Sequence, residues 1–489
     1  MLNRIIFDIQ ALNLSSIAPM ILLIFFALGI LCISMVKKEL SNRFYLSLTI
    51  VGLILNFITI SSPLANFRGM FNIVLMDGIA VFSIILIIAT SIFFMALKFE
   101  DNYSSETSKP EFYSLFLFML VGYEFMVSSD NLILIIIGLE LSSLALYTLI
   151  ALKNTKYSVE AALKYFVMGS VGSGFFIFGC AILYLVTGSV EMHTIYSAIS
   201  EAKMKSNLTL YAGTIFIVVA IGFKVSLVPF HTWLPDVYEG ASTPLAAYIS
   251  IVPKIAAFVI GLRIFDSFLL AGIDWISNVL YIIIVLTMTL ANITALVQKS
   301  VKRMLAFSSI SNAGFAMAAI LVGTTQATMS LFLYWIMFAI ANLGAFSVVW
   351  VMENVNNEKS KVKFENFSGL IKEQPLLALI MAIFMFSLAG IPPFSLFWGK
   401  IYIIGSILSV EYNILAVIMV LNSAIAVYYY LKIVVYMFLK EPLEKIEISI
   451  KLVRFVLILT ALLSIFAPIV VEYIFSTLKL SSMIIISGY

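Results

Sequence analysis

The chain is poor in the residues that bind metals and clusters. Of its 489 residues only two are cysteine, Cys32 and Cys180, and both stand inside apolar runs. Two cysteines cannot supply a four-cysteine iron–sulfur cluster or a disulfide scaffold. The two histidines, His193 and His231, are too few for a multi-histidine metal site or a haem. The sequence therefore predicts that this chain holds no metal, cluster or haem of its own.

Charged residues are also scarce. They make up 11% of the chain, whereas 62% of its residues are hydrophobic. An ordinary soluble domain is about 45–50% apolar and about 25% charged. This composition excludes an ordinary soluble multidomain protein and favours an all-α polytopic membrane protein. Residues 1–16 contain no long apolar core followed by a cleavage site, so we expect no signal peptide and insertion directed by the first span.

Apolar runs of about 20 residues predict helices that cross a bilayer. The sequence contains fourteen such runs, at residues 17–36, 44–62, 77–97, 112–129, 131–152, 160–187, 208–233, 242–265, 275–297, 304–323, 328–352, 376–400, 412–438 and 452–476.

The basic residues give an independent test of these spans. The odd-numbered loops contain 18 of the 29 lysines and arginines, whereas the even-numbered loops contain only four, Arg68, Lys203, Lys205 and Arg263. Loops rich in lysine and arginine stay on the cytoplasmic side. We therefore place the odd-numbered loops in the cytoplasm and both termini on the opposite side.

Two of the predicted spans contain internal prolines. Span seven contains Pro229, and span twelve contains Pro392 and Pro393. Proline removes a backbone donor and clashes with the preceding turn, so both helices should be broken. The two breaks are five spans apart and therefore run in opposite directions, which indicates an inverted repeat with a site near the midplane. We expect a three-helix segment over 1–111, five-helix repeats over 112–266 and 275–438, and a last span within 439–489.

An acid and a lysine lie at similar depth in the first repeat. Glu140 is about ten residues into span five, roughly 15 Å deep, and Lys224 lies about one turn before the break in span seven. Each costs roughly 2.5–3.5 kcal/mol at the centre of a membrane helix. The two could form a static ion pair or an ion or proton path. We favour the path, because the lysines inside spans outnumber the acids.

Further lysines extend the candidate path. Lys254 follows Pro253 in the middle of span eight, where a proline frees a backbone carbonyl that can solvate the ammonium group. Lys400 closes the broken span twelve. We expect every cation inside a span to be lysine and none arginine; lysine can release a proton where arginine stays charged.

Three residues are accessory candidates. Lys164 lies five residues into span six, His231 follows the break of span seven, and Lys432 lies in span thirteen, the repeat counterpart of span eight. Lys164 and Lys400 could instead extend to the membrane interface. His231 could be a structural hydrogen-bond donor. Glu124 in span four and Asp77 at the start of span three are weaker candidates, and Glu124 fits helix packing equally well.

Several motifs resemble the antiporter-like subunit N of bacterial NADH:quinone oxidoreductase (respiratory complex I), whose mitochondrial relative is NADH dehydrogenase subunit 2. The most specific are 223–240 (FKVSLVPFHTWLPDVYEG) and 252–254 (VPK). Supporting matches are 138–140 (GLE), 160–166 (EAALKYF), 302–309 (KRMLAFSS), 390–394 (GIPPF), 397–400 (FWGK) and 428–432 (YYYLK). Two positions depart from the family pattern: Ser242 stands where proline is common, and Lys432 where arginine is common.

The resemblance implies a proton-translocating subunit of the membrane arm, multi-pass in the bacterial inner membrane, with both termini periplasmic. It implies that Glu140 and Lys224 form a modulating pair, that Lys254 is the central relay and that Lys400 is the far-side residue. It also implies that NAD, FMN, iron–sulfur clusters and quinone belong to partner subunits. Two alternatives remain open: a subunit of a multisubunit cation/proton antiporter, and a purely structural subunit that spaces its neighbours.

Overall fold

The structure is a computed structural model that describes residues 12–37, 40–61, 67–98, 109–201, 208–273, 275–355, 362–442 and 451–486. Within these ranges the regular structure is helical apart from one hairpin, β1 (Phe67–Gly69) and β2 (Val74–Met76). The helices up to residue 270 are η1 (Leu14–Ile17), α2 (Ala18–Val36), α3 (Asn42–Ser61), α4 (Gly78–Lys98), α5 (Pro110–Val127), α6 (Leu132–Ala151), α7 (Lys156–Thr187), α8 (Met192–Glu201), α9 (Leu208–Val225), α10 (Trp233–Gly240), α11 (Thr243–Ile249) and α12 (Val252–Leu270). Those that follow are α13 (Trp275–Leu296), α14 (Val301–Val322), α15 (Thr325–Val355), η3 (Phe364–Phe367), α16 (Leu370–Glu373), α17 (Pro375–Ala389), α18 (Ser395–Leu408), α19 (Asn413–Leu439), α20 (Lys451–Ile465) and α21 (Ala467–Ile486).

The described helices confirm an all-α protein with many membrane spans. Twelve of them are long and apolar enough to cross a bilayer, and α20 with α21 adds a thirteenth if that bent pair counts as one span. These two helices meet at 76°, whereas the sequence predicted one continuous span over 452–476. The bend lies beside Pro468, whose ring cannot continue the preceding helix. The predicted twelfth span, 376–400, is divided into the shorter helices α17 and α18.

Both predicted breaks are present. Helix α9 ends at Val225, a turn before Pro229, and α10 begins at Trp233. Helix α17 ends at Ala389, and α18 begins at Ser395, after Pro392 and Pro393. The span over 242–265 also contains an interruption that the sequence did not predict, because α11 ends at Ile249 and α12 starts at Val252.

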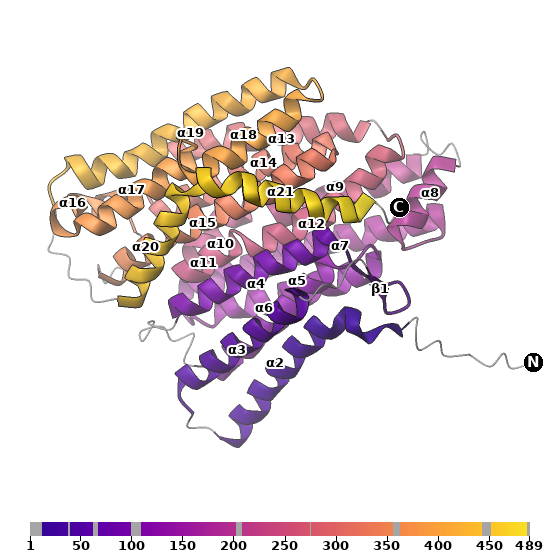
Figure 1. Cartoon of the computed structure of the whole chain (residues 1–489), viewed down its shortest axis with the longest axis horizontal. Coiled ribbons are helices and arrows are strands. Elements are labelled where there is room, and N and C mark those ends of the chain that lie inside the picture. Colours follow the sequence, from indigo (N-terminus) through magenta and orange to yellow (C-terminus); the bar gives the residue numbers. More distant parts are fainter. Residues whose placement is uncertain are drawn as a thin grey trace, which may run out of the picture.

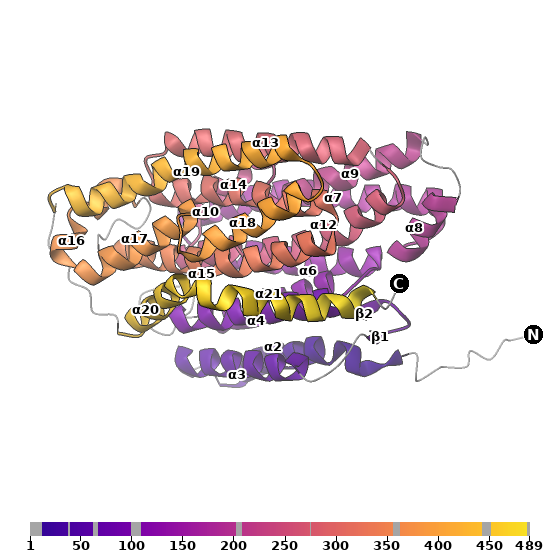
Figure 2. The same ribbon diagram turned by 45° about the horizontal axis from the view of Figure 1, so that its top comes forward.

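The helices lie in layers. In Figure 2, α2 and α3 form the outermost layer, α4 and α21 lie above them, and α13 and α19 lie on the opposite side. The centre of the bundle contains three helical segments that are almost wholly covered by protein. In the most apolar stretch of each span, the share of residues that are buried is 94% for the α11–α12 segment, 94% for α14 and 89% for α15. The corresponding share is 39% for both α7 and α19. Side chains on these three segments are therefore the ones held away from lipid.

Close contact between α5 and α6 depends on two glycines. A Cβ atom added at Gly122 would lie 2.6 Å from the backbone oxygen of Gly138, and one at Gly138 would lie 2.6 Å from that of Gly122. Small residues at a helix interface let the backbones approach closely in membrane proteins. This contact fixes the face of α6 from which Glu140 projects.

The last described helix returns to the start of the bundle. Helix α21 packs against α4 and α15, and both Figure 1 and Figure 2 show it running alongside α4. The predicted placement of the two termini concerns residues 1–11 and 487–489, which lie outside the described residues.

Candidate functional site

The break after α9 places Lys224 at the end of a helix. The backbone is held across the break by bonds from Leu227 N to the Gly222 oxygen (2.7 Å) and from Trp233 Nε1 to the Phe223 oxygen (3.2 Å). Lys224 Nζ donates to Ser143 Oγ at 2.8 Å, and Ser143 in turn donates to its own helix. The break thus directs the ammonium group of Lys224 towards α6.

Glu140 lies one turn before Ser143 on the same helix. Its Oε1 atom is buried and has no hydrogen-bond partner among the described residues. No described carboxylate oxygen lies within 4.0 Å of Lys224 Nζ, so the two predicted partners face the same region without forming a close ion pair. A serine hydroxyl, rather than a carboxylate, holds the lysine.

A small cavity of about 10 Å³ separates Lys224 from the helix of Lys254. Its lining includes Lys224 and Ala220 from α9 and Ala257, one turn after Lys254, from α12. This volume is close to that of one water-sized sphere. The cavity therefore borders Lys224 directly and reaches the helix that carries Lys254.

Lys254 is held by α14. Only 1% of the residue is exposed, and its Nζ donates to the backbone oxygen and to Oγ of Ser309, both at 2.7 Å. The interruption between α11 and α12 puts Lys254 in the first turn of α12, where it can reach the neighbouring helix. Ser309 also lies 3.4 Å from the hydroxyl of Tyr238 in α10.

One face of α14 continues from Ser309 towards Lys400. Ser308 is hydrogen-bonded to the hydroxyl of Tyr430, and Asn312 Nδ2 donates to the Ser308 oxygen at 3.0 Å. The Tyr334 hydroxyl donates to Asn312 Oδ1 at 2.7 Å. Phe315 lies one turn further along the helix. Positions separated by four and seven residues share a helix face, so these side chains form one row.

Lys400 lies at the far end of this row. Its Nζ is 5.1 Å from the centre of the Phe315 ring, and it donates to the backbone oxygens of Leu388 (3.2 Å) and Ala389 (3.3 Å). Both carbonyls belong to the last turn of α17. Because the helix stops there, no backbone N–H of a following turn is available to them. Gly390 has φ of +82°, and a Cβ atom there would lie 3.0 Å from Cδ of Lys400. A residue without a side chain is needed for this approach.

Comparisons with known proteins identify the family of this chain. Residues 129–426 match the family described as "NADH:quinone oxidoreductase/Mrp antiporter, TM". The NADH-quinone oxidoreductase subunit N of Campylobacter hominis is 52% identical over 476 residues, which cover 95% of this chain and 97% of that protein. This chain belongs to the subunit N family.

Solved structures of other membrane complexes contain chains with a similar fold. A chain of the respiratory complex I from Thermus thermophilus, solved with bound aureothin, is 28% identical and has a TM-score of 0.81, over 94% of this chain and 99% of that one. A chain of the Mrp complex from Dietzia sp. also has a TM-score of 0.81, over 96% of this chain and 97% of that one. Its identity is 18%, so this likeness concerns the fold alone.

The accessory candidates of this subunit N family member lie away from the buried row. The side chain of Lys164 is 46% exposed and forms ion pairs with Glu160 and Asp236, both at 2.9 Å. Lys432 is half-buried, with its Nζ 4.3 Å from the centre of the Phe364 ring. His231 is half-buried in the break after α9, with its Nδ1 atom buried and without a hydrogen-bond partner among the described residues.

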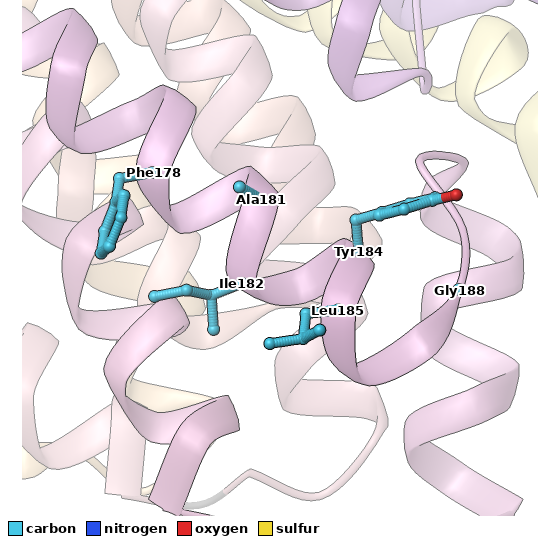
Figure 3. A pocket seen from close by; sticks show the side chains of 6 residues that line it. All are labelled: Phe178, Ala181, Ile182, Tyr184, Leu185 and Gly188. Atoms are coloured by element: carbon cyan, nitrogen blue, oxygen red, sulfur yellow. The ribbon is translucent and has the colours of Figure 1, made fainter.

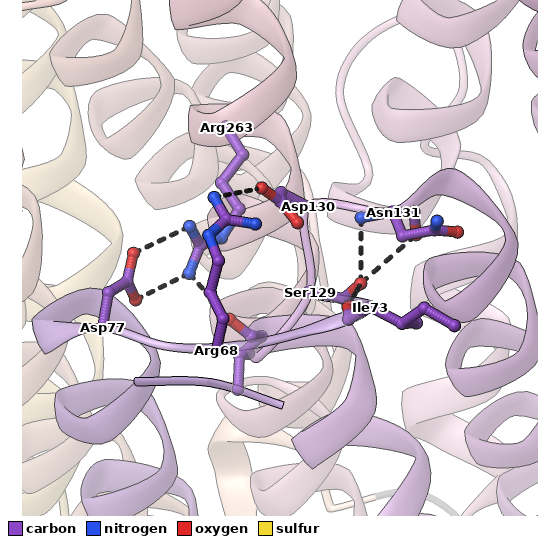
Figure 4. Close-up of polar contacts among 8 residues, drawn as sticks. Arg68, Ile73, Asp77, Ser129, Asp130, Asn131 and Arg263 are labelled. Atoms are coloured by element: carbon purple, nitrogen blue, oxygen red, sulfur yellow. Dashed lines mark hydrogen bonds and ion pairs between the residues drawn. The ribbon is translucent and has the colours of Figure 1, made fainter. Parts of the chain in front are cut away.

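The expectation that no arginine lies inside a span is wrong. Arg263 lies within α12 and is 8% exposed. It donates to both carboxylate oxygens of Asp77, at 2.9 and 2.8 Å, and to the backbone oxygen of Val127 (Figure 4). Asp77 also accepts from the backbone of Ala80 and so caps α4. This buried ion pair joins α12, α4 and the end of α5, which accounts for an arginine at that depth.

A second charged group lies at the opposite end of α14 from Phe315. Lys302 is 1% exposed, donates to the Ala241 oxygen at 3.1 Å and lies 3.8 Å from Glu353. Glu353 also accepts from the hydroxyl of Thr243 and lies 4.0 Å from Lys153. Lys302 precedes Ser309 by two helical turns on the same face. The sequence placed Lys302 and Lys153 in loops and so did not predict this group.

An open depression on the surface of α7 contains no carboxylate, ammonium, guanidinium or imidazole group. It runs along α7 and is lined by Phe178, Ala181, Ile182, Tyr184, Leu185 and Gly188 (Figure 3). None of these residues is an acid or a base. Among the described residues, no cluster of histidine, cysteine, aspartate or glutamate could hold a metal ion.

Proposed function

We propose that this chain is a proton-translocating subunit in the membrane arm of an NADH:quinone oxidoreductase. One observation carries the proposal: Lys224, Lys254 and Lys400 are each held by neutral oxygen atoms, and none has a described carboxylate within 4.0 Å. A buried ammonium group without a counter-ion is costly. Lysine can give up its proton in such a place, so these groups suit a relay better than a static ion pair.

The path that we propose follows α14. A proton passes between Lys224 and Lys254 across the small cavity, and then along the hydroxyl and amide groups of Ser309, Ser308 and Asn312 to Lys400. Helix α14 rises about 9 Å between Ser309 and Phe315. Tyr334 and Tyr430 complete the hydrogen bonds of this row. A change in the distance between Glu140 and Lys224 would modulate the first transfer.

The buried group of Lys302 and Glu353 supplies an entry to this path. It connects to Lys153 at the side where the basic loops lie, which the charge bias of the sequence assigns to the cytoplasm. Lys302 and Ser309 share one face of α14, so a proton that reaches Lys302 is two turns from the site of Lys254. Lys164, His231 and Lys432 are accessory to this path.

The repeat architecture is part of the proposal. Helices α17 and α18 together make the twelfth span in chain order, broken as α9 and α10 are broken, and this brings the number of spans to fourteen. Residues 112–266 and 275–438 then form two inverted repeats, preceded by the segment 1–111 and followed by 439–489. Two broken helices, each ending near a buried lysine, support this arrangement.

The cellular setting follows from the family. We place the chain in the bacterial inner membrane, with both termini on the periplasmic side, beside other antiporter-like and small membrane-arm subunits. NAD, FMN, the iron–sulfur clusters and quinone belong to the partner subunits. Electron transfer to quinone in those subunits drives proton movement here.

The first test removes the proposed modulating pair. We expect Lys224→Ala or Glu140→Ala to reduce NADH-driven proton uptake into inverted membrane vesicles several-fold, because the first transfer loses its donor or its modulator. Dye-monitored acidification and NADH oxidation are measured on the same vesicles. The amount of assembled complex, checked on a native gel, should stay unchanged. Unchanged uptake by a fully assembled variant would refute the relay and favour a structural subunit.

The antiporter alternative makes a different prediction. The shared fold with the Mrp complex favours it as the second candidate. In vesicles without any NADH dehydrogenase, an antiporter subunit supports sodium-dependent proton exchange. We expect no such exchange, and its appearance would favour the antiporter.

A second test interrupts the row on α14. Asn312→Leu keeps the size of the side chain but removes both hydrogen bonds that link Ser308 and Tyr334. We expect slower NADH-driven proton uptake, together with a loss of about 1–3 kcal/mol of stability from the unsatisfied groups. Ser347→Ala is the matched control, because among the described residues the Ser347 hydroxyl donates only within its own helix, to the Leu343 oxygen. Equal uptake by the two variants would exclude Asn312 from the path.

A further inference from the structure

Glu124 is a buried acid that the proposed path does not use. It lies in α5, is 0% exposed, and neither of its carboxyl oxygens has a hydrogen-bond partner among the described residues. A carboxylate in such a position would be an ion without counter-charge or hydrogen bonds, which is far more costly than a neutral acid. Its protonation state is therefore the feature that needs an explanation.

Glu124 lies on the side of α5 that faces away from α6. Gly122 packs against Gly138 of α6, and Glu124 lies two residues later, about 200° further round the helix. Helix α5 packs on that side against α2 and α3, the outermost layer in Figure 2. Asn56 of α3 lies within reach of the Glu124 carboxyl group. Glu124 thus lies between three helices, on the other side of α5 from Glu140.

Helices α2, α3 and α4 offer no charge to pair with Glu124. In α12, which also packs against α5, Arg263 is already paired with Asp77, and Lys254 is held by Ser309. Helix α2 contains no aspartate, glutamate, lysine, arginine or histidine, and the only such residue in α3 is Arg43 in its first turn. Arg43 precedes Asn56 by 13 residues, about 20 Å along the helix. In α4 the only one is Lys98 in its last turn, at the opposite end from the Asp77 cap. A carboxylate here would stay uncompensated by α2, α3 and α4.

The hydrogen bonds of Asn56 show which form of Glu124 fits. Asn56 is 0% exposed, its Nδ2 donates to the Pro19 oxygen at 3.0 Å, and its Oδ1 has no donor among the described residues. The carbonyl of Pro19 fixes the amide, because the reverse orientation would bring two oxygens together. A carboxylate has only acceptor atoms, so it cannot satisfy Asn56 Oδ1. A protonated carboxyl group supplies the missing donor.

We propose that Glu124 and Asn56 form a second proton-binding site, in which Glu124 is a neutral carboxylic acid. This site is separate from the path between Lys224 and Lys400. The ligand is a proton rather than a metal cation. Hard cations take six or more oxygen ligands, and the site offers three unpartnered side-chain oxygens.

The site lies close to a route for exchange. Three residues after Glu124, about 4.5 Å along α5, the Val127 oxygen accepts from Arg263, which is paired with Asp77 (Figure 4). The nearby Arg68 pairs with Asp130 and has 39% of its side chain exposed. We expect the proton on Glu124 to exchange with the medium at the end of the bundle that carries Arg68.

Infrared spectroscopy of the intact complex in membranes tests the site. The spectrum of the unchanged protein minus that of Glu124→Gln should contain the carbonyl stretch of a protonated carboxyl group at neutral pH. In deuterated water this band should shift as the proton exchanges. Glu111→Gln is the matched control, because Glu111 is exposed at the start of the same helix and should contribute carboxylate bands instead.

Each other outcome overturns part of the proposal. Carboxylate bands in the Glu124 difference spectrum, such as a bound sodium ion would leave, would refute a proton-binding site. A carbonyl band that never shifts in deuterated water would refute exchange with the medium. Since glutamine can donate to Asn56 Oδ1 as the protonated acid does, Glu124→Gln should assemble normally, whereas Glu124→Asp, which is too short to reach, should assemble less. Equal assembly of these two variants would contradict the proposed hydrogen bond.

Discussion

Replacing Lys254 with methionine should lower proton translocation through this chain by about 10²-fold or more, because the relay loses its central titrating group. Methionine fills a similar volume, and the hydroxyl of Ser309 is left without its donor. Since Lys254 is almost fully buried, no solvent path can replace it directly. The measurement is dye-monitored acidification of inverted vesicles, normalised to the amount of assembled complex.

The variant Lys254→Arg distinguishes a proton-relay role of Lys254 from a purely structural role. Lys254→Arg keeps a positive charge and hydrogen-bond donors but does not release a proton. We expect it to be as inactive as Lys254→Met. Lys372→Met is the control, because Lys372 is an exposed lysine paired with Glu441 at the surface. Full translocation by Lys254→Arg would show that the charge, and not the transfer of a proton, is what the protein needs.

Replacing Arg263 with leucine should destabilise the folded subunit by about 3–5 kcal/mol. The carboxylate of Asp77 is 8% exposed, and the substitution leaves it buried without its partner. Such a loss is a large part of the stability of a typical domain. We therefore expect little of this subunit in the assembled complex, as measured by immunoblot of native gels.

A double substitution tests this explanation. Asp77→Leu together with Arg263→Leu removes both charges, and replacing a buried ion pair by apolar residues is often neutral or stabilising. We expect the double variant to recover most of the lost subunit. Arg68→Leu is the surface control, since its pair with Asp130 is partly exposed and worth about 0–1 kcal/mol. A double variant as depleted as Arg263→Leu would show that Arg263 has another role.

The charged residues of the site could be predicted from sequence, whereas their neutral neighbours could not. Lys224, Lys254 and Lys400 stand out because an ammonium group in an apolar run is costly and needs a reason. Asn312, Tyr334 and Tyr430 are ordinary residues in membrane helices, and their hydrogen bonds join positions 22 and 122 residues apart. Only the packing of α14 against α15 and α19 brings them together.

The misplacement of Arg263 has an identifiable cause. Arg263 lies near the end of its span and the charge count placed it in a loop, so the sequence offered Asp77 as a candidate without its buried partner. Lys164 stands within an apolar run, but Glu160 precedes it by four residues, a spacing that stabilises an exposed helical ion pair. That spacing indicates a surface position for Lys164.

The contact between α21 and α4 has a consequence for biosynthesis. Helix α4 ends at Lys98, and its partner α21 does not begin until Ala467. At about 5–20 residues per second, a ribosome needs roughly 20 to 70 s to make the intervening chain. During that time the flank of α4 that α21 will cover must be occupied by lipid or by an insertion factor. A nascent chain that terminates early therefore leaves a fully inserted but open bundle, which quality-control proteases can recognise before the respiratory complex assembles.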